Sequence, residues 1–175
     1  MSARRGAPGA VSTAVHRLAA HTFRRLGGWV QWRVLWLVND TFMVGVSALV
    51  HDDTGRVLVL RHRYWSAATW GLPSGYMHRR ETPAQTIARE VTEETGLELV
   101  DLREVRHDWG YTFRVEVYVE ARVVGNVDAD ALHIDGREVL AARFVRPDDL
   151  PDGILGSHRR MIEDWAASRF DTGSD

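Results

Sequence analysis

The stretch that decides the fold runs from Gly75 to Leu97 and reads GYMHRRETPAQTIAREVTEETGL. If residues 82–95 form a helix, Glu90, Glu93 and Glu94 stand at positions i, i+3 and i+4, so their carboxylates share one face. Carboxylates this close repel one another unless a cation lies among them. Because Mg2+ and Mn2+ prefer hard oxygen ligands, the pattern predicts a metal site suited to polyphosphate chemistry. The alternative is a solvated acidic helix face that ends at a glycine.

The fixed residues of this stretch follow the spacing G-x5-E-x7-R-E-V-x-E-E-x-G-L, which resembles the Nudix box. Every fixed position of that motif is filled, by Gly75, Glu81, Arg89, Glu90, Val91, Glu93, Glu94, Gly96 and Leu97. Strand patterns on both sides and a last helical pattern extend the likeness to roughly residues 40–170. The resemblance implies an α/β fold, the Nudix-type α/β/α sandwich with a mixed sheet, here with an N-terminal helical extension.

The pattern along the chain predicts two parts, a basic, Trp-rich helical extension over residues 1–38 and a Nudix hydrolase domain over residues 39–175. Within the extension, residues 11–26 fit an amphipathic helix, and residues 29–38, WVQWRVLWLV, are apolar on nearly all sides. Residues 1–10 are expected to be disordered. The apolar run is too short to cross a bilayer, and a convincing signal-peptide cleavage site is lacking.

Beyond residue 40 the pattern is that of a sheet protein with helices. Strands are predicted over residues 41–50, 56–63, 98–106, 111–123 and 138–146, and helices over residues 82–95 and 157–170. Thr82 and Pro83 suit the N-cap and the first turn of the box helix, which Gly96 ends. Residues 63–74 are predicted to form an aromatic-rich loop.

The composition excludes several kinds of chemistry. The chain has no Cys, which rules out disulfides, zinc–thiolate sites and thiol nucleophiles, and fits a cytoplasmic location. All 22 Lys and Arg positions hold Arg, so lysine Schiff-base and P-loop lysine chemistry are excluded as well. Residues 1–38 hold six Arg and no acidic residue, whereas the remainder holds 16 Arg against 24 acidic residues. The acidic body argues against a stable nucleic-acid partner, and the basic extension favours an anionic surface or an acidic neighbour.

The resemblance implies a divalent metal site, with Mg2+ as the cofactor and Mn2+ as a substitute. Its ligands would be the side chains of Glu90, Glu93 and Glu94 and the backbone carbonyl of Ser74. Ser74 stands where family members often have a glycine, and its Cβ restricts the backbone there. The structural residues of the loop and the helix end would be Gly75, Glu81 and Gly96, with Gly75 permitting the turn into the helix.

The implied reaction is metal-assisted hydrolysis of a diphosphate bond. Its catalytic residues would be Arg89, Glu93 and a general base outside the box. Arg89 is expected to orient a carboxylate through a bidentate pair. For the base we favour Glu138, just before a predicted strand, with Asp135 and Glu116 as rivals. Position alone does not establish a base, so a plain strand-edge charge at Glu138 stays an alternative.

Four side chains outside the box are candidates for binding the substrate. Arg61 and Arg63 flank the entry to the aromatic loop and suit phosphate groups. Trp70 and Tyr111 suit stacking on the nucleobase of a substrate. Tyr64, Trp65 and Trp109 are further aromatic candidates, and each aromatic residue has a place in the core as its alternative. Marks of particular family subtypes are absent, so the identity of the diphosphate stays open.

The sequence therefore predicts a Nudix pyrophosphohydrolase that uses Mg2+ to hydrolyse a nucleoside diphosphate linked to another moiety, or a nucleoside triphosphate. One alternative is a non-catalytic, ligand-sensing Nudix domain, although such domains usually lose box carboxylates that are kept here. Another is a membrane-surface protein that acts on a non-nucleotide diphosphate. The expected partner is a small-molecule diphosphate. Residues 11–38 are expected to pack on the domain or form a homodimer interface in preference to a peripheral membrane contact, which stays the alternative.

Overall fold

The computed structural model describes residues 10–66, 69–109, 113–125, 127, 132–134 and 136–171. The chain divides into two compact units, Met1–Thr41 and Phe42–Asp175. Disorder is predicted for residues 1–10, of which residues 1–9 lie outside the described residues.

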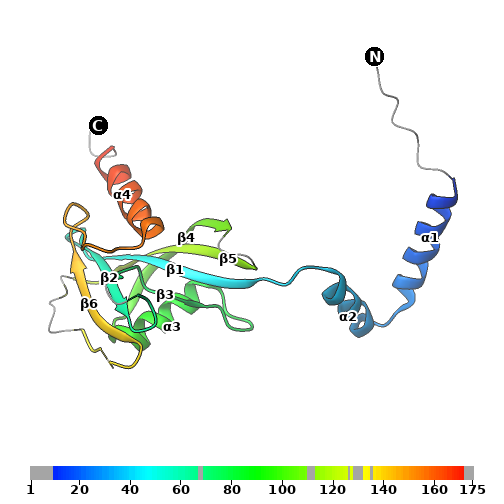
Figure 1. The fold of residues 1–175 in the computed structure, drawn as a ribbon, viewed down its shortest axis with the longest axis horizontal. Helices are drawn as coiled ribbons and strands as arrows, with labels where there is room; N and C mark the ends of the chain where they lie inside the picture. The colour runs from blue at the N-terminus through cyan, green and yellow to red at the C-terminus, as the bar shows by residue number, and fades with distance from the viewer. Residues whose placement is uncertain are drawn as a thin grey trace, which may run out of the picture. The chain divides into compact units, whose positions relative to one another are not determined.

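The first unit consists of two helices, α1 (Ala10–Arg25) and α2 (Gly28–Val38) (Figure 1). Both agree with the helices predicted from the apolar pattern. The side-chain amide of Gln31 in α2 donates a hydrogen bond of 2.8 Å to the carbonyl of Phe23 in α1, so the two helices are joined across the break at Gly27.

The second unit is built on a six-stranded mixed sheet. Its strands are β1 (Met43–His51), β2 (Val57–His62), β3 (Ser74–Tyr76), β4 (Leu99–Trp109), β5 (Arg114–Val123) and β6 (Val139–Val145). The order is β4-β5-β1-β2-β6, with β3 paired to β1. Strands β1 and β5 run parallel, and the other pairs are antiparallel. The short strand β3 was not predicted, because the sequence there reads as a loop.

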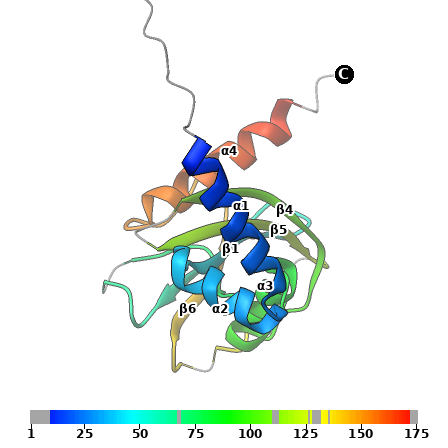
Figure 2. The same ribbon diagram turned by 90° about the vertical axis from the view of Figure 1, so that its right-hand side faces the viewer.

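Two helices cover opposite faces of the sheet, α3 (Pro83–Thr95) and α4 (Gly156–Asp171) (Figures 1 and 2). Side chains alternate between the faces of a strand, and the two core clusters follow this alternation. Val46 and Val50 of β1 pack with Ile87 of α3, whereas Leu49 packs with Ile162 of α4. The α/β/α sandwich with a mixed sheet is therefore confirmed.

The box helix α3 has strong signals at both ends. The Thr82 side chain accepts a hydrogen bond from the Gln85 backbone, and the Gln85 side chain accepts one from the Thr82 backbone, which is a capping box. Pro83 stands in the first turn, and Gly96 ends the helix in the left-handed region with φ of 72°. These ends are the ones that the sequence predicted.

Candidate active site

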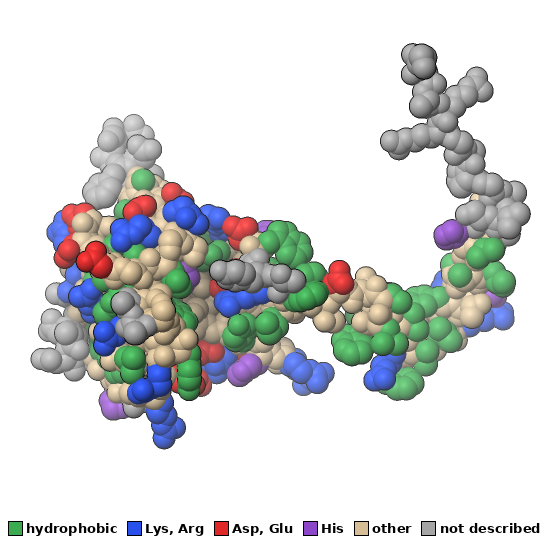
Figure 3. All heavy atoms as spheres, in the orientation of Figure 1, with side chains coloured by type: hydrophobic (Ala, Val, Ile, Leu, Met, Phe, Trp, Pro, Cys, Tyr) green, Lys and Arg blue, Asp and Glu red, His purple; other side chains and the backbone are tan. Residues whose placement is uncertain are grey.

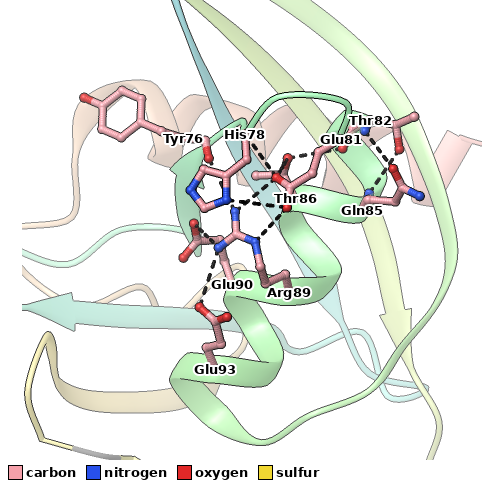
Figure 4. A network of polar contacts seen from close by, with 9 residues as sticks. All are labelled: Tyr76, His78, Glu81, Thr82, Gln85, Thr86, Arg89, Glu90 and Glu93. Atoms are coloured by element: carbon pink, nitrogen blue, oxygen red, sulfur yellow. Dashed lines mark hydrogen bonds and ion pairs between the residues drawn. The ribbon is translucent and has the colours of Figure 1, made fainter.

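Arg89 lies at the centre of the polar network of the box (Figure 4). Its Nε and Nη2 atoms donate to the two carboxylate oxygens of Glu81 at 3.0 and 3.2 Å, which is a bidentate pair. Its Nη1 atom donates to Oε1 of Glu90 at 2.8 Å and lies 3.5 Å from Oε2 of Glu93. One guanidinium therefore offsets the repulsion among three carboxylates and ties the loop to the helix.

Glu81 is fixed by the loop and by the helix. The backbone N–H of His78 and the hydroxyl of Thr86 each donate to its Oε2 atom at 3.0 Å. The hydrogen bonds from Arg89, followed by the bond from His78, lower the pKa of Glu81 to about 2. Glu81 is therefore ionised at any pH near neutrality and serves as an anionic anchor for the guanidinium.

Glu90 reaches the loop because residue 75 is a glycine. A Cβ atom added at Gly75 would lie 2.1 Å from Oε1 of Glu90 and 2.3 Å from its carboxyl carbon. Strand β3 pairs Gly75 with Val46 of β1, which fixes the loop backbone against the sheet. The glycine thus leaves the space that the Glu90 carboxylate fills.

Glu94 differs from the other acids of the helix in its surroundings. It is 7% exposed, and its Oε1 atom lies 3.4 Å from Nε2 of His62 in β2. The Glu93 side chain, in contrast, is 62% exposed. Burial lowers the pKa of His62 and keeps its imidazole neutral near pH 7. The three carboxylates of one helical face are thus divided between Arg89 and His62.

These residues fit a divalent cation by the chemistry of their donors. Glu81, Glu90, Glu93 and Glu94 offer only carboxylate oxygens, which suit Mg2+ and Mn2+. Within the described part of the chain, no group of three acidic or His side chains forms a ready metal cage. The guanidinium of Arg89 contacts three of these carboxylates. A bound cation would share these oxygens with Arg89.

A cavity of about 640 Å³ lies between the sheet and the start of α4. Its charged lining residues are Arg106, Asp108, Arg114, Glu116 and Arg160, and its aromatic ones are Trp65, Trp109 and Tyr118. Strand β3 borders both the cavity and the box, because successive residues of a strand face opposite sides. Ser74 lines the cavity, and the next residue, Gly75, receives Glu90.

Glu116 is the buried acid of this cavity, with 8% of its surface exposed. The Ser47 hydroxyl donates to its Oε1 atom at 2.6 Å, and Nη2 of Arg114 lies 2.6 Å from its Oε2 atom. In the parallel register Gly45 lies beside Glu116, and a Cβ atom there would come within 2.5 Å of the carboxylate. The Arg114 guanidinium also stacks on the Tyr76 ring, 5.0 Å from its centroid, so the cavity charges reach the box loop.

Some predicted site residues line this cavity and others do not. Ser74, Glu116, Trp65 and Trp109 line it. Trp70 instead packs in the core on the α4 side, where the guanidinium of Arg61 lies 5.7 Å and that of Arg143 4.5 Å from the ring centroid.

Arg63 and Glu138 also lie away from the cavity lining. Arg63 donates to the carbonyls of Gly136 and Arg137 at 3.0 and 2.9 Å, and its backbone N–H donates to the carbonyl of Glu138 at 2.7 Å. Glu138 itself is exposed. Tyr111 and Asp135 lie outside the described residues, so their predicted roles stay predictions.

Sequence reasoning missed most of the cavity lining, including the charged or titratable side chains of Arg106, Arg114, His158 and Arg160. The Arg114-Val-Glu116 spacing does signal a pair on one strand face, because residues i and i+2 point the same way. The pairing of β5 with β1 and the approach of α4 could not be read from spacing.

His158 anchors the start of α4 to the loop before the box. It is 6% exposed, and its Nδ1 atom accepts a hydrogen bond of 3.0 Å from the backbone N–H of Leu72. Burial, followed by the nearby charge of Arg114, lowers the pKa of His158 to about 4. The imidazole is therefore neutral near pH 7 and works as an acceptor at this position.

Comparison with known proteins points to one family. The protein-family model of the NUDIX domain matches residues 41–165 of this chain. The NAD-capped RNA hydrolase NudC of Enterobacter sp. (strain 638) is 32% identical over 127 residues, which cover 70% of this chain and 46% of that relative. The protein of the same name from Escherichia coli O1:K1 is 31% identical over 127 residues. This chain thus spans less than half the length of the curated relatives it matches.

Solved structures show the same fold. The NUDIX domain of NrtR from Shewanella oneidensis, complexed with ADP ribose, matches with a TM-score of 0.61 and 18% identity, covering 86% of this chain and 97% of that one. The MutT protein from Methanosarcina mazei Go1 matches with a TM-score of 0.57 and 20% identity, over 75% and 98% of the two chains. At these identities the likeness concerns the fold alone.

Proposed function

The chain belongs to the Nudix hydrolase family, and on this premise we propose that residues 39–175 hydrolyse the diphosphate bond of a nucleoside diphosphate linked to another moiety, with Mg2+ as cofactor. The observation that carries the proposal is the box itself. Arg89 gathers Glu81, Glu90 and Glu93 at the box helix. Strand β3 connects this network to a cavity with three arginines and two tryptophans, because Ser74 lines the cavity and the next residue, Gly75, receives Glu90.

The box carboxylates are the proposed metal ligands, namely Glu90, Glu93 and Glu94, with the carbonyl of Ser74. A divalent cation would neutralise phosphate charge and lower the pKa of a bound water. Arg89 is a positioning residue in this proposal, because it holds Glu81 through two hydrogen bonds and Glu90 through one. Gly75 contributes by leaving room for Glu90.

Hydrolysis needs a base that accepts a proton from the attacking water. The water oxygen bonds to one phosphorus, the bond from that phosphorus to the bridging oxygen breaks, and the bridging oxygen leaves with the other phosphate. We propose Glu116 as the base in preference to Glu138, because Glu116 lines the cavity and Glu138 does not. The bonds from Ser47 and Arg114 orient the Glu116 carboxylate. Both Nε and Nη2 of Arg114 contact Oε2, whereas Oε1 accepts from Ser47 and retains a second lone pair for a water proton.

The cavity suits an anionic substrate with an aromatic group. Arg106, Arg114 and Arg160 offer guanidinium groups for phosphate oxygens, and Trp65 and Trp109 offer ring faces on which a nucleobase can stack. The relatives named NAD-capped RNA hydrolases make dinucleotides with a diphosphate bridge the first substrates to try.

The test is a substrate panel with the full chain. NAD, NADH, ADP-ribose, a UDP-sugar and nucleoside triphosphates are each incubated with Mg2+ or Mn2+, and the products are identified by mass spectrometry. Running the reaction in oxygen-18 water shows which phosphorus is attacked. We expect metal-dependent cleavage of at least one compound with a diphosphate bridge. An absence of cleavage across the panel with either metal would overturn the proposal.

A matched pair of variants connects activity to the box. Glu94→Gln removes one buried carboxylate charge, and Glu98→Gln removes an exposed one just beyond the helix end. We expect Glu94→Gln to lose turnover by orders of magnitude and Glu98→Gln to keep it, because an amide is a poor ligand for a hard cation.

A further inference from the structure

The first unit carries an apolar surface that the hydrolase site does not use. Trp29, Trp32 and Trp36 of α2 stand at i, i+3 and i+7, so they share one face of the helix. Their exposed fractions are 75%, 74% and 63%. In Figure 3 apolar side chains gather over this unit with basic side chains among them. An apolar patch of this kind marks an interaction surface.

The junction between α1 and α2 leaves this tryptophan face uncovered. The half-buried residues of α2 are Val30, Gln31 and Val34, which lie on the side of the helix opposite the tryptophans. Gln31 also makes the hydrogen bond that joins the two helices. The contact with α1 thus uses one side of α2 and presents the tryptophan face outward from the helix pair.

The charged side chains of residues 1–38 are of one sign. Residues 1–38 contain six Arg and no Asp or Glu. Arg24 and Arg25 lie in the last turn of α1, next to the junction with α2. The guanidinium of Arg33 lies over the Trp29 ring, 5.8 Å from its centroid. Positive charge therefore borders the tryptophan face directly.

We propose that α1 and α2 dock the protein on an anionic lipid surface, with the tryptophan face in the headgroup region and the arginines against lipid phosphates. Tryptophan prefers the membrane interface, and arginine keeps its charged end in water or on phosphate while its stem lies on apolar surface. Within the described residues, no helix is long and apolar enough to cross a membrane. The helices therefore lie on the surface, where apolar burial and attraction to anionic lipid act together.

Charge distinguishes lipid from the other possible occupants. A second copy of residues 1–38 would bring six arginines against six more, which opposes a homodimer through this face. Single-stranded RNA would stack on the tryptophans, but it would leave Leu35, which flanks them on α2 and is 40% exposed, in water. An anionic bilayer interface takes up the tryptophans, Leu35 and the bordering arginines at once.

The experiment is flotation of the full chain with vesicles of phosphatidylcholine, alone or with about 30 mol% phosphatidylserine. We expect binding to the anionic vesicles, weakened as salt rises from about 0.05 to 0.5 M, and little binding to the neutral ones. Trp29→Gln/Trp32→Gln/Trp36→Gln should abolish the binding. Arg24→Gln/Arg25→Gln should weaken it about 25-fold, at about fivefold per arginine.

Matched controls come from the second unit. Arg103→Gln/Arg146→Gln removes two exposed arginines, and Tyr64→Gln removes an exposed aromatic ring, so neither should change vesicle binding. Turnover of a soluble substrate should stay unchanged in the α1 and α2 variants, which also shows that the second unit is folded. This readout separates the docking proposal from the proposed hydrolase function.

Three results would overturn the docking proposal. The first is an intact protein that does not float with anionic vesicles at low salt. The second is a dimer in sedimentation velocity that the tryptophan substitutions dissociate, with no vesicle binding. The third is binding of a single-stranded RNA probe through the same residues, without any binding to vesicles.

Discussion

Replacing Gly75 with alanine tests whether the loop and the box helix act as one site. The added Cβ atom would lie 2.1 Å from Oε1 of Glu90, whereas ordinary van der Waals contact begins at 3.4 Å. The Glu90 carboxylate must therefore move by more than 1 Å. Gly75 does not have a positive φ, so alanine adds no backbone strain and the effect is steric.

A displacement of about 1 Å at a reacting group costs on the order of 100-fold in rate. We therefore expect Gly75→Ala to lower kcat/KM by about that factor on the substrate found in the panel, and to weaken Mn2+ binding in titration calorimetry. Circular dichroism should show an intact fold. Gly28→Ala is the matched control, because a Cβ atom there meets nothing within 4 Å. Activity within twofold of the parent protein would refute the view that Gly75 fixes the Glu90 carboxylate.

Four further outcomes follow from the described contacts. Arg89→Lys should recover little of the activity that Arg89→Ala loses, since an ammonium lacks the fork that holds both Glu81 oxygens; full recovery would reduce the role of Arg89 to its charge. Glu94→Gln should weaken Mn2+ binding measured by paramagnetic resonance, and unchanged affinity would remove Glu94 from the ligand set. Glu116→Gln should lower kcat by on the order of 100-fold or more and Glu138→Gln should leave it nearly unchanged, whereas the reverse ranking would restore Glu138 as the base. Between pH 6.5 and about 4 the unfolded chain protonates His158 and the native state does not, so the free energy of unfolding should fall by about 3 kcal/mol as pH drops through this window. His158→Asn should flatten that slope in urea titrations, and an unchanged slope would assign it to other groups.

The local features of the chain could be predicted from the sequence because each depends on near neighbours. The cap at Thr82, the end at Gly96 and the shared face of Glu90 and Glu93 follow from spacing within one helix. The bidentate geometry of Arg89 also follows from the chemistry of the guanidinium next to carboxylates eight residues away or fewer.

The cavity could not be predicted, because its parts meet only through the register of distant strands. Ser47 and Glu116 are 69 residues apart in sequence and come together only because β1 and β5 run parallel. The predicted base at Glu138 precedes the β6 edge strand, which spacing alone could not distinguish from a cavity wall. The sequence predicts Trp70 as a surface for stacking on substrate. In the structure its ring is partly buried and packs against the core cluster on the α4 side of the sheet.

The parallel pairing of β1 and β5 also has a consequence for how the protein folds. Contacts between residues far apart in sequence have an entropic cost of loop closure. They form late when they become favourable only in a nearly complete sheet. The box helix has its own caps and can form early from contacts within residues 82–96. We therefore expect a folding order in which the acidic helix precedes the Ser47–Glu116 contact, and hydrogen exchange during refolding should show protection in α3 before protection in β5.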